Sequence, residues 1–304
     1  MSWDPRRLPS EAGRTYVVTG GNAGIGYFTA EQLASTGARV IIASRSADKT
    51  EHAMASIRDR VPGAALQFVR LDLSSLASVA SAAAQLRGLG TIDGLVNNAG
   101  LTSPSARRAT TSDGLELVVG SNFFGHFALT AQLWPAMSET GRVVGLGSMA
   151  TRMVRLDPSD LLSERHYRPF RAYGFSKHAV HGFAFELDRR LRAAGEHRLS
   201  LLAHPGFSVD GLSERRPGIN DLPPLTRVRD GILAVAGQGK HQGAWPTVRA
   251  ALDPDAESGQ FYGPSRTLTG LPIVMAPVVS SATPDFGAHL WALAERETGV
   301  TFTV

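Results

Sequence analysis

The feature that most constrains the fold of this chain is a regular alternation of short apolar runs with longer stretches of helical composition. The apolar runs predict strands at residues 14–19, 39–44, 66–71, 91–97, 142–146 and 198–203. Helices are predicted between and after them, at residues 25–35, 46–58, 75–86, 113–137 and 172–194. Strands that alternate with helices at this spacing indicate βαβ units, and therefore a parallel sheet with helices on both faces. The sequence thus predicts a single doubly wound α/β domain over residues 1–304, with a sheet of about seven strands.

The composition excludes several classes of protein. Of the 304 residues, 43% are hydrophobic and 19% are charged, so the chain can bury a large core and is not expected to be disordered. It has no cysteine, which excludes a disulfide scaffold, thiolate zinc sites and cysteine-based catalysis. No apolar stretch is long enough to span a membrane, and the N-terminus has no apolar run of a secretory signal. We therefore expect a cytoplasmic protein with no membrane span.

Charge and histidine content argue against two kinds of partner. Lys and Arg outnumber Asp and Glu by 31 to 27, but the basic residues are scattered along the chain, so no nucleic-acid partner is expected. His178 and His181 share a helix face, but no acid or further His is near them in sequence, so we expect packing or solvent exposure and no metal site. The expected partner is a small-molecule substrate, and the sequence is compatible with a homo-oligomer.

A glycine-rich turn follows the first predicted strand. The motif TGGNAGIG at residues 19–26 has glycines at 20, 24 and 26, directly before a helix. Gly20 and Gly24 permit a tight turn and a close backbone approach to a diphosphate, while the helix presents free N–H groups and the positive end of its dipole. An ordinary βα turn can also contain glycines. The position in the first βαβ unit favours nucleotide binding, and hence a domain of the Rossmann type.

The end of the second predicted strand bears on the choice of cofactor. NAD sites usually have an Asp or Glu there, which binds the 2′-hydroxyl of the ribose. This chain has Ser44 and Arg45 instead, with Lys49 one helical turn further on. A guanidinium group can hold a 2′-phosphate through two hydrogen bonds, so the sequence favours NADP(H) over NAD(H).

The third and fourth predicted strands also end in polar side chains. Asp72 can accept a hydrogen bond from an adenine amino group, or it can cap the helix that follows. Asn97 and Asn98 can satisfy backbone groups of neighbouring strands. In an open α/β sheet, ligands bind at the carboxyl ends of the strands, so these side chains are expected near one site.

A Tyr–Lys pair stands at residues 173 and 177, four positions apart on one face of a predicted helix. A free phenol has a pKa near ~10, so Tyr173 is a poor acid–base group at neutral pH unless a cation such as Lys177 lowers that pKa. Ser148, just after the fifth strand, can hydrogen-bond a carbonyl oxygen. Such a pair is usually an ordinary helix surface, but together with the glycine-rich turn it indicates catalysis.

These motifs together resemble the short-chain dehydrogenase/reductase family. TGGNAGIG (19–26), NNAG (97–100), Asn122 within SNFFGHF, Ser148 and YGFSK (173–177) occur in the family's order and cover nearly the whole chain. Further stretches are similar to the branch of retinol dehydrogenases and protochlorophyllide reductases, which typically uses NADPH: ASRS (43–46), RHYRPFRAYGFSK (165–177), LAHPG (202–206) and SGQFYGP (258–264).

The resemblance implies a catalytic tetrad of Asn122, Ser148, Tyr173 and Lys177. In that scheme Tyr173 gives or takes the proton, Lys177 lowers its pKa and holds the nicotinamide ribose, Ser148 positions the carbonyl, and Asn122 helps to hold a water. The cofactor-binding residues that motif and resemblance imply are Gly20, Asn22, Gly24, Ile25, Gly26, Ser44, Arg45, Asp72, Leu73, Asn98, Tyr173, Lys177, Pro205, Gly206 and Ser208.

The chain departs from the family's pattern after Gly206. Branch members usually have a Thr or Ser at the position of Asp210, which binds the carboxamide of the nicotinamide. Either Asp210 accepts a hydrogen bond from the carboxamide, or it points to solvent toward Arg215 or Arg216 and Ser208 makes the contact. We favour the second arrangement, because a buried, unpaired carboxylate is costly.

Two long segments, about 149–171 and 206–250, leave the carboxyl edge of the sheet and are expected to form the walls of the substrate site. Their apolar side chains suggest a moderately apolar substrate: Met149, Met153, Leu156, Phe207 and Leu212.

Three functions fit these observations. The first is an NADPH-dependent carbonyl reductase or alcohol dehydrogenase that acts on a ketone, an aldehyde or a secondary alcohol. The second is a redox-neutral isomerase or epimerase that uses bound NADP and returns the hydride. The third is a non-catalytic NADP-binding regulator, which would have no need of Tyr173 with Lys177.

Overall fold

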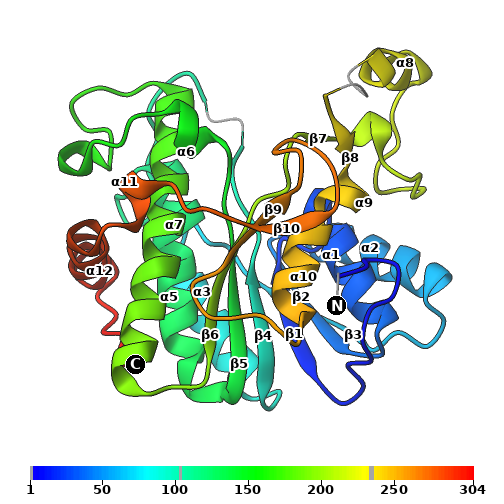
Figure 1. The fold of residues 1–304 in the computed structure, drawn as a ribbon, viewed down its shortest axis with the longest axis horizontal. Helices are drawn as coiled ribbons and strands as arrows, with labels where there is room; N and C mark the ends of the chain where they lie inside the picture. The colour runs from blue at the N-terminus through cyan, green and yellow to red at the C-terminus, as the bar shows by residue number, and fades with distance from the viewer. Residues whose placement is uncertain (1–2, 103–104, 233–235) are drawn as a thin grey trace.

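The computed structural model describes residues 3–102, 105–232 and 236–304, and its centre is one mostly parallel sheet (Figure 1). The sheet has eight strands in the order β10-β9-β6-β5-β4-β1-β2-β3, and β10 alone runs antiparallel to its neighbour. The strands are β1 Thr15–Thr19, β2 Arg39–Ser44, β3 Leu66–Arg70, β4 Ile92–Asn97, β5 Met137–Leu146, β6 Leu199–Ala203, β9 Phe261–Pro264 and β10 Pro272–Met275. The predicted doubly wound α/β fold is therefore confirmed, with an antiparallel edge strand added to seven parallel strands.

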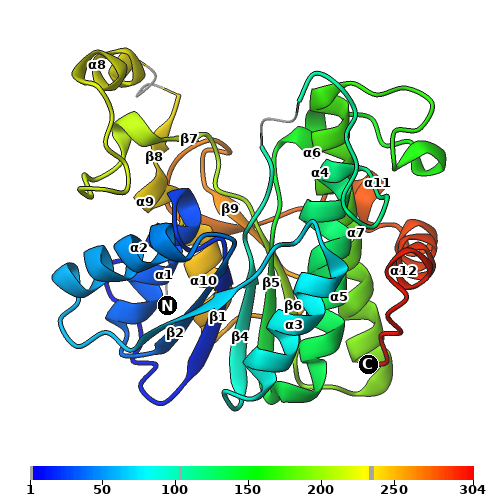
Figure 2. The same cartoon turned by 180° about the vertical axis from the view of Figure 1, so that it is seen from behind.

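Helices cover both faces of the sheet, as Figures 1 and 2 show from opposite sides. One face carries α3 Leu76–Arg87, α5 Gly125–Leu133, α7 Pro169–Ala194 and α12 Pro284–Thr298. The other carries α1 Gly24–Ser35, α2 Ala47–Arg60 and α10 Trp245–Leu252. Because both faces are buried, the central strands are continuous apolar runs: Val17 of β1 packs into the first core, while Tyr16 and Val18 pack into the second.

Local hydrogen bonds and backbone conformation set several helix boundaries. Ser46 accepts a hydrogen bond from the Lys49 N–H at the start of α2. Thr283 does the same for the Phe286 N–H at the start of α12. The helix α7 ends where Gly195 takes a left-handed conformation, with φ of 68°.

The predicted helix at 113–137 is wrong in its limits and in its regularity. Glu116 accepts hydrogen bonds from the N–H groups of Val118 and Val119, so the helix begins only at α4 Leu117–Val119. A π-helical turn, η1 Gly120–Phe124, then leads into α5 and the short η2 Trp134–Ala136. Strand β5 starts at Met137 rather than 142, because Met137 already pairs with Ile92 of β4 before a register shift.

Small elements lie above the carboxyl edge of the sheet (Figure 1). The segment 149–171 contains α6 Ala150–Met153 and η3 Pro158–Asp160. The segment 206–250 contains β7 Ser208–Val209, η4 Asp210–Leu212, α8 Pro224–Ile232, β8 Gln238–Gly239 and α9 Lys240–Gly243, and then the first part of α10; its residues 233–235 are outside the described ones. Strands β7 and β8 pair with each other as a separate two-stranded sheet. The remaining helix, α11 Val279–Ala282, packs beside α7.

No helix in the described ranges is both long enough and apolar enough to cross a bilayer.

Candidate active site

A cleft of about 850 Å³ opens at the carboxyl edge of the sheet. It lies where β1 is flanked by β4 and β2, the point at which the order of the strands reverses. Every residue that the sequence indicated for cofactor binding lines this cleft, from Gly20 at the end of β1 to Ser208 in β7. Ser148, Tyr173 and Lys177 line it too, whereas Asn122 does not.

The glycine-rich turn is shaped to let a ligand approach the backbone. Gly20 and Gly24 have φ of +67° and +59°, values that side chains rarely permit. A Cβ on Gly26 would collide with the side chain of Asn98 and with the Gly20 carbonyl. Ala23, which precedes α1, offers no side-chain cap, so the first N–H groups of α1 are free for an anion. These features fit the diphosphate of a dinucleotide.

Asn98 and Thr19 join the ends of β4 and β1. The Asn98 side chain donates a hydrogen bond to the Thr19 carbonyl at 2.7 Å, and Thr19 Oγ1 accepts one from the Asn98 N–H at 2.9 Å. The prediction that an Asn at this position satisfies a neighbouring strand is confirmed, and it makes this part of the cleft rigid.

The polar residues at the ends of β2 and β3 differ in which side-chain atoms are left to bind a ligand. Ser44 Oγ is 2.6 Å from Thr50 Oγ1, and one carboxylate oxygen of Asp72 accepts hydrogen bonds from the N–H and hydroxyl of Ser74. Asp72 thus makes a local turn, and its other oxygen remains for a ligand. Arg45 is exposed on the lining of the cleft, where it can meet an anionic group.

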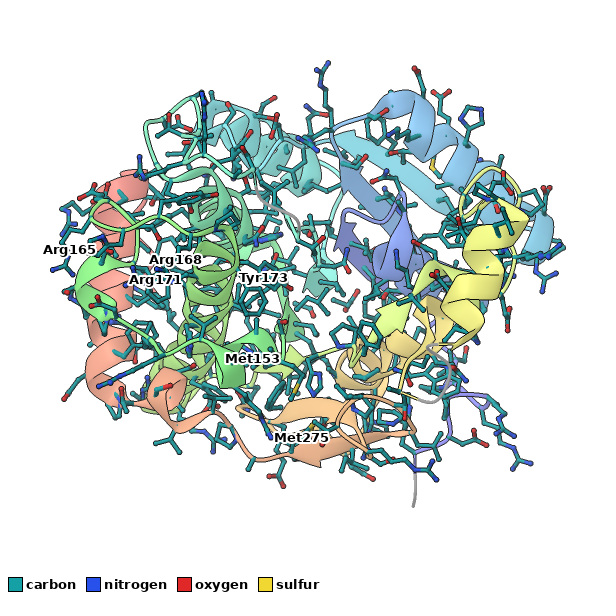
Figure 3. All side chains as sticks on the ribbon, turned by 90° about the horizontal axis from the view of Figure 1, so that it is seen from above. Met153, Arg165, Arg168, Arg171, Tyr173 and Met275 are labelled. Atoms are coloured by element: carbon teal, nitrogen blue, oxygen red, sulfur yellow. The ribbon has the colours of Figure 1, made fainter. Side chains whose placement is uncertain are left out.

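Ser148, Tyr173 and Lys177 form one wall of the cleft. Figure 3, which looks down on this edge, shows Tyr173 on the side of α7 that faces the middle of the molecule. The Lys177 ammonium nitrogen is 5.8 Å from the centre of the Tyr173 ring and donates a hydrogen bond to the Leu146 carbonyl at 2.7 Å. The helical spacing of four residues places both side chains on the same face of α7.

Burial is the main influence on the acid–base properties of this wall. It raises the pKa of Tyr173, and a hydrogen bond with the Ser148 side chain acts against it. Burial outweighs the influence of Ser148, and the expectation that Lys177 lowers this pKa stays a prediction. Burial also lowers the pKa of Lys177 to about 8, since an ammonium group loses hydration there.

Asn122 stands behind the cleft, in the π-helical turn η1. Its side chain accepts a hydrogen bond from the Leu101 N–H at 2.7 Å and donates one to Ser176 Oγ at 2.9 Å. The backbone carbonyl oxygen of Asn122 is 3.0 Å from His126 Nδ1. Asn122 therefore ties the loop after β4 to α7, and its contact with a water in a proton relay stays a prediction.

The buried histidines of α7 serve packing. His178 contacts the hydroxyl of Ser281 at 2.6 Å and the Val154 carbonyl at 2.7 Å. His181 Nε2 accepts a hydrogen bond from the Ser148 N–H at 3.4 Å. Burial lowers the pKa of both imidazoles, which favours their neutral form.

Asp210 has a partner that neither of the two possibilities named. Its carboxylate forms an ion pair with the ammonium of Lys240 at 2.5 Å. Arg216, one of the expected partners, instead binds Glu31 at 2.6 Å. Ser208 Oγ donates its hydrogen bond to the Pro205 carbonyl at 2.8 Å. The preference for Arg215 or Arg216 as the partner of Asp210 was therefore wrong.

The apolar residues expected around the substrate separate into two groups. Phe207 lines the cleft and is 40% exposed. Met153 is 73% exposed and does not line the cleft, and Leu156 packs against the core. Met149 and Leu212 are half-buried and do not line it either, so these four do not form the wall as expected.

Sequence reasoning missed Lys240 and Phe170, which also line the cleft. Phe170 lies in the first turn of α7, just before the Tyr–Lys pair, and its position there was a usable signal. Lys240 offers little beyond being a lysine in a chain whose basic residues are mostly arginine.

The comparisons with known proteins agree with this geometry. Residues 14–196 match the family model described as short chain dehydrogenase. The chain is 38% identical to the polyprenol dehydrogenase of Mus musculus, over 97% of this chain and 87% of that protein. It is also 38% identical to mouse retinol dehydrogenase 13, over 96% of this chain and 86% of that protein.

Solved structures show the same fold. A crystal structure of an uncharacterized protein from Mycobacterium paratuberculosis is 35% identical and covers 100% of both chains, with a TM-score of 0.81. A protein from Beutenbergia cavernae described as an NAD(P)-dependent gluconate 5-dehydrogenase, solved with NADP bound at low occupancy, is 27% identical over 84% of this chain and 96% of its own, with a TM-score of 0.61. The chain thus belongs to the short-chain dehydrogenase/reductase family of oxidoreductases, within its retinol-dehydrogenase-like branch.

Proposed function

We propose that this protein is an NADPH-dependent carbonyl reductase or alcohol dehydrogenase for a moderately apolar ketone, aldehyde or secondary alcohol. The observation that carries the proposal is a single cleft with Ser148, Tyr173 and Lys177 on one wall and Arg45 on its lining. The hydride is the chemistry that a bound nicotinamide dinucleotide supplies.

Ser148 and Tyr173 have separate roles in the proposed reaction. Ser148, hydrogen-bonded to Tyr173, orients the carbonyl oxygen of the substrate. Tyr173 Oη gives its proton to the oxygen as an alkoxide develops there, and takes it back in the direction of oxidation. General acid help of this kind is worth about 10²–10⁴ in rate.

Lys177 supplies positive charge behind the phenol. Its ammonium group is held by the Leu146 carbonyl and lies on the same face of α7 as Tyr173. A cation there opposes the cost of a negative charge on the Tyr173 oxygen while the proton is absent.

Arg45 sets the preference for NADPH in this proposal. The end of β2 has no carboxylate to bind the 2′-hydroxyl of the ribose, and the exposed guanidinium offers paired donors to a 2′-phosphate. The residues that would hold the rest of the dinucleotide are the glycine-rich turn, Asp72 and Asn98.

An apolar substrate is supported by Phe170 and Phe207, which line the cleft. The names of the two mouse relatives, polyprenol dehydrogenase and retinol dehydrogenase 13, also refer to apolar alcohols.

The test is a panel of ketones, aldehydes and alcohols, followed by the absorbance of NADPH. We expect stoichiometric use of NADPH with at least one apolar carbonyl compound. Conversion of a substrate with only a catalytic amount of cofactor and no net change in NADPH would favour the redox-neutral isomerase instead. Tight NADPH binding with no turnover on any compound would favour a regulator.

A further inference from the structure

Lys240 is the lining residue of the cleft that neither the motifs nor the catalytic scheme accounts for. Its ammonium nitrogen lies 3.6 Å from the point where a Cβ on Gly24 would stand. Gly24 is the first residue of α1, so this ammonium lies beside the N-terminus of that helix. The Lys240 side chain is 24% exposed and the Asp210 side chain, its partner, is 34% exposed.

The position of Lys240 is fixed by four independent contacts of its short helix, α9. The Lys240 N–H donates a hydrogen bond to Ser213 Oγ at 2.8 Å. Gly239, just before it, pairs with Val209 between β8 and β7. The Gln32 side chain of α1 donates to the His241 carbonyl at 3.0 Å, and the His241 ring packs 6.0 Å from that of Phe28. Both ribbon views accordingly show α9 beside α1 (Figures 1 and 2).

This arrangement brings two positive groups to one place. The start of α1 has the positive end of the helix dipole and uncapped N–H groups, and the ammonium of Lys240 faces the same space. The Asp210 carboxylate neutralises the ammonium from the other side. An anion between Lys240 and the turn would gain from both positive groups, and in dinucleotide-binding folds the diphosphate lies at this turn.

We propose that Lys240 binds the diphosphate of the dinucleotide, and that Asp210 competes with the diphosphate for its ammonium group. This inference rests on the proposed function, because it requires that a dinucleotide occupies the cleft. It also explains the departure at Asp210: the residue that replaces the usual Thr or Ser acts on the diphosphate through Lys240 and makes no contact with the carboxamide.

The test is to measure binding of NADPH and NADH by calorimetry to the wild type and to Lys240→Met. Since both cofactors have the same diphosphate, we expect a loss of about tenfold or more for each, a change of about 1.4 kcal/mol, with an unaltered ratio between them. Lys240→Arg, which keeps the charge, should retain most of the affinity.

A control for net charge is Arg192→Met, which removes the exposed ion pair between Arg192 and Asp188 on α7. Neither residue lines the cleft, so affinity should stay within twofold. The same small change in Lys240→Met would overturn the proposal, and a loss confined to NADPH would assign Lys240 to the 2′-phosphate instead.

Asp210→Asn tests the competition without removing Lys240. It should bind both cofactors at least as tightly as the wild type, because the ammonium is then free for the diphosphate. Weaker binding of both cofactors by this variant would refute the competition. It would mean that Asp210 helps to position Lys240 or contacts the cofactor itself. A wild type that binds neither cofactor would defeat the proposed function as well, whereas normal binding and turnover with an unaffected Lys240→Met would defeat this inference alone.

Discussion

At the cofactor end of the cleft, the turns after β1 and β4 are joined by short hydrogen bonds between Asn98 and Thr19, and glycines pack where no Cβ fits. The segments 149–171 and 206–250 above the sheet are held by hydrogen bonds such as that of the Lys240 N–H to Ser213, and also by ion pairs such as those of Arg171 with Asp157 and Asp160. Figure 3 shows Arg165, Arg168 and Arg171 on that side of the molecule.

The two regions also differ in what they expose. Within the described residues, no large hydrophobic side chain before residue 150 is exposed. Four exposed ones lie in the two segments, Met153, Phe170, Phe207 and Leu225, and the others lie at 268–279. Partly exposed ion pairs contribute little to stability. Under the proposed function, we therefore expect the first region to bind the dinucleotide and the second region to bind the substrate.

The largest effect is expected where the two regions meet, at Tyr173. Tyr173→Phe removes one hydroxyl, so folding and cofactor binding should survive while turnover falls by about 10² or more, the range of general acid catalysis. Steady-state kinetics with NADPH and a reactive ketone measure it. Tyr167→Phe is the matched control, since the Tyr167 hydroxyl donates to the Ser105 carbonyl outside the cleft. Near-normal turnover by folded Tyr173→Phe would show that another group moves the proton.

Gly26→Ala tests the rigidity of the cofactor end. The added methyl group would overlap the Asn98 side chain and the Gly20 carbonyl, and overpacking of this kind costs about 1–3 kcal/mol. We expect a lower free energy of unfolding in urea, together with weaker binding of both cofactors. Gly231→Ala in α8, where a Cβ would meet nothing within 4 Å, is the control and should change neither quantity appreciably. Equal behaviour of the two variants would mean that the turn is not tightly packed.

Burial of Lys177 makes the stability of the protein depend on pH. Its pKa is about 8 in the folded protein and 10.5 without burial, so between these values the unfolded chain binds more protons and stability rises with pH. Below pH 8 the cost of burying the charge is fully present. The stability of the wild type relative to Lys177→Met should therefore improve by about 3 kcal/mol between pH 7 and pH 10.5. Urea unfolding of both proteins without cofactor measures it, and a difference that stays constant over this range would contradict the lowered pKa.

How far the sequence predicts this molecule depends on whether a signal is local. The strand cores were predictable because both faces of the sheet are covered. Residues on alternate faces, such as Val17 and Val18, are therefore both buried and form continuous apolar runs. The helix at 113–137 was misjudged because its start depends on the buried carboxylate of Glu116, and β5 was too short because Met137 pairs with a distant strand.

The same distinction applies to the site. The glycine-rich turn and the Tyr–Lys pair are short local motifs. Gly20, Asn22 and residues 24–26 of the turn and both residues of the pair line the cleft. Lys240 reaches Gly24 only through β7, β8 and α9, and Asp210 finds its partner through the same path. No local pattern contains those contacts, so only the structure reveals them.

Arg45→Ala tests whether Arg45 selects NADPH over NADH at the cofactor end of the cleft. Loss of the guanidinium should weaken NADPH by about tenfold, or about 1.4 kcal/mol, and leave NADH within twofold, because only NADPH has the 2′-phosphate. Titration of both cofactors against one protein provides its own control. Equal affinity of the wild type for the two cofactors would remove the basis for the preference, and an equal loss for both in the variant would place Arg45 on a group that they share.

The smallest effect is expected in the apolar region, at Phe207. Its ring lines the cleft but remains 40% exposed, so an apolar substrate would cover only part of it. At about 25 cal/mol per Å² of apolar surface removed from water, that contact is worth under 1 kcal/mol. Phe207→Ala should therefore raise KM for an apolar ketone about threefold, with kcat and NADPH affinity nearly unchanged. Met153→Ala, at a residue that is more exposed and outside the lining, should leave KM within experimental error. If Met153→Ala raises KM as much as Phe207→Ala does, the substrate extends beyond the cleft onto α6, and the apolar region takes a larger part in recognition than the lining alone indicates.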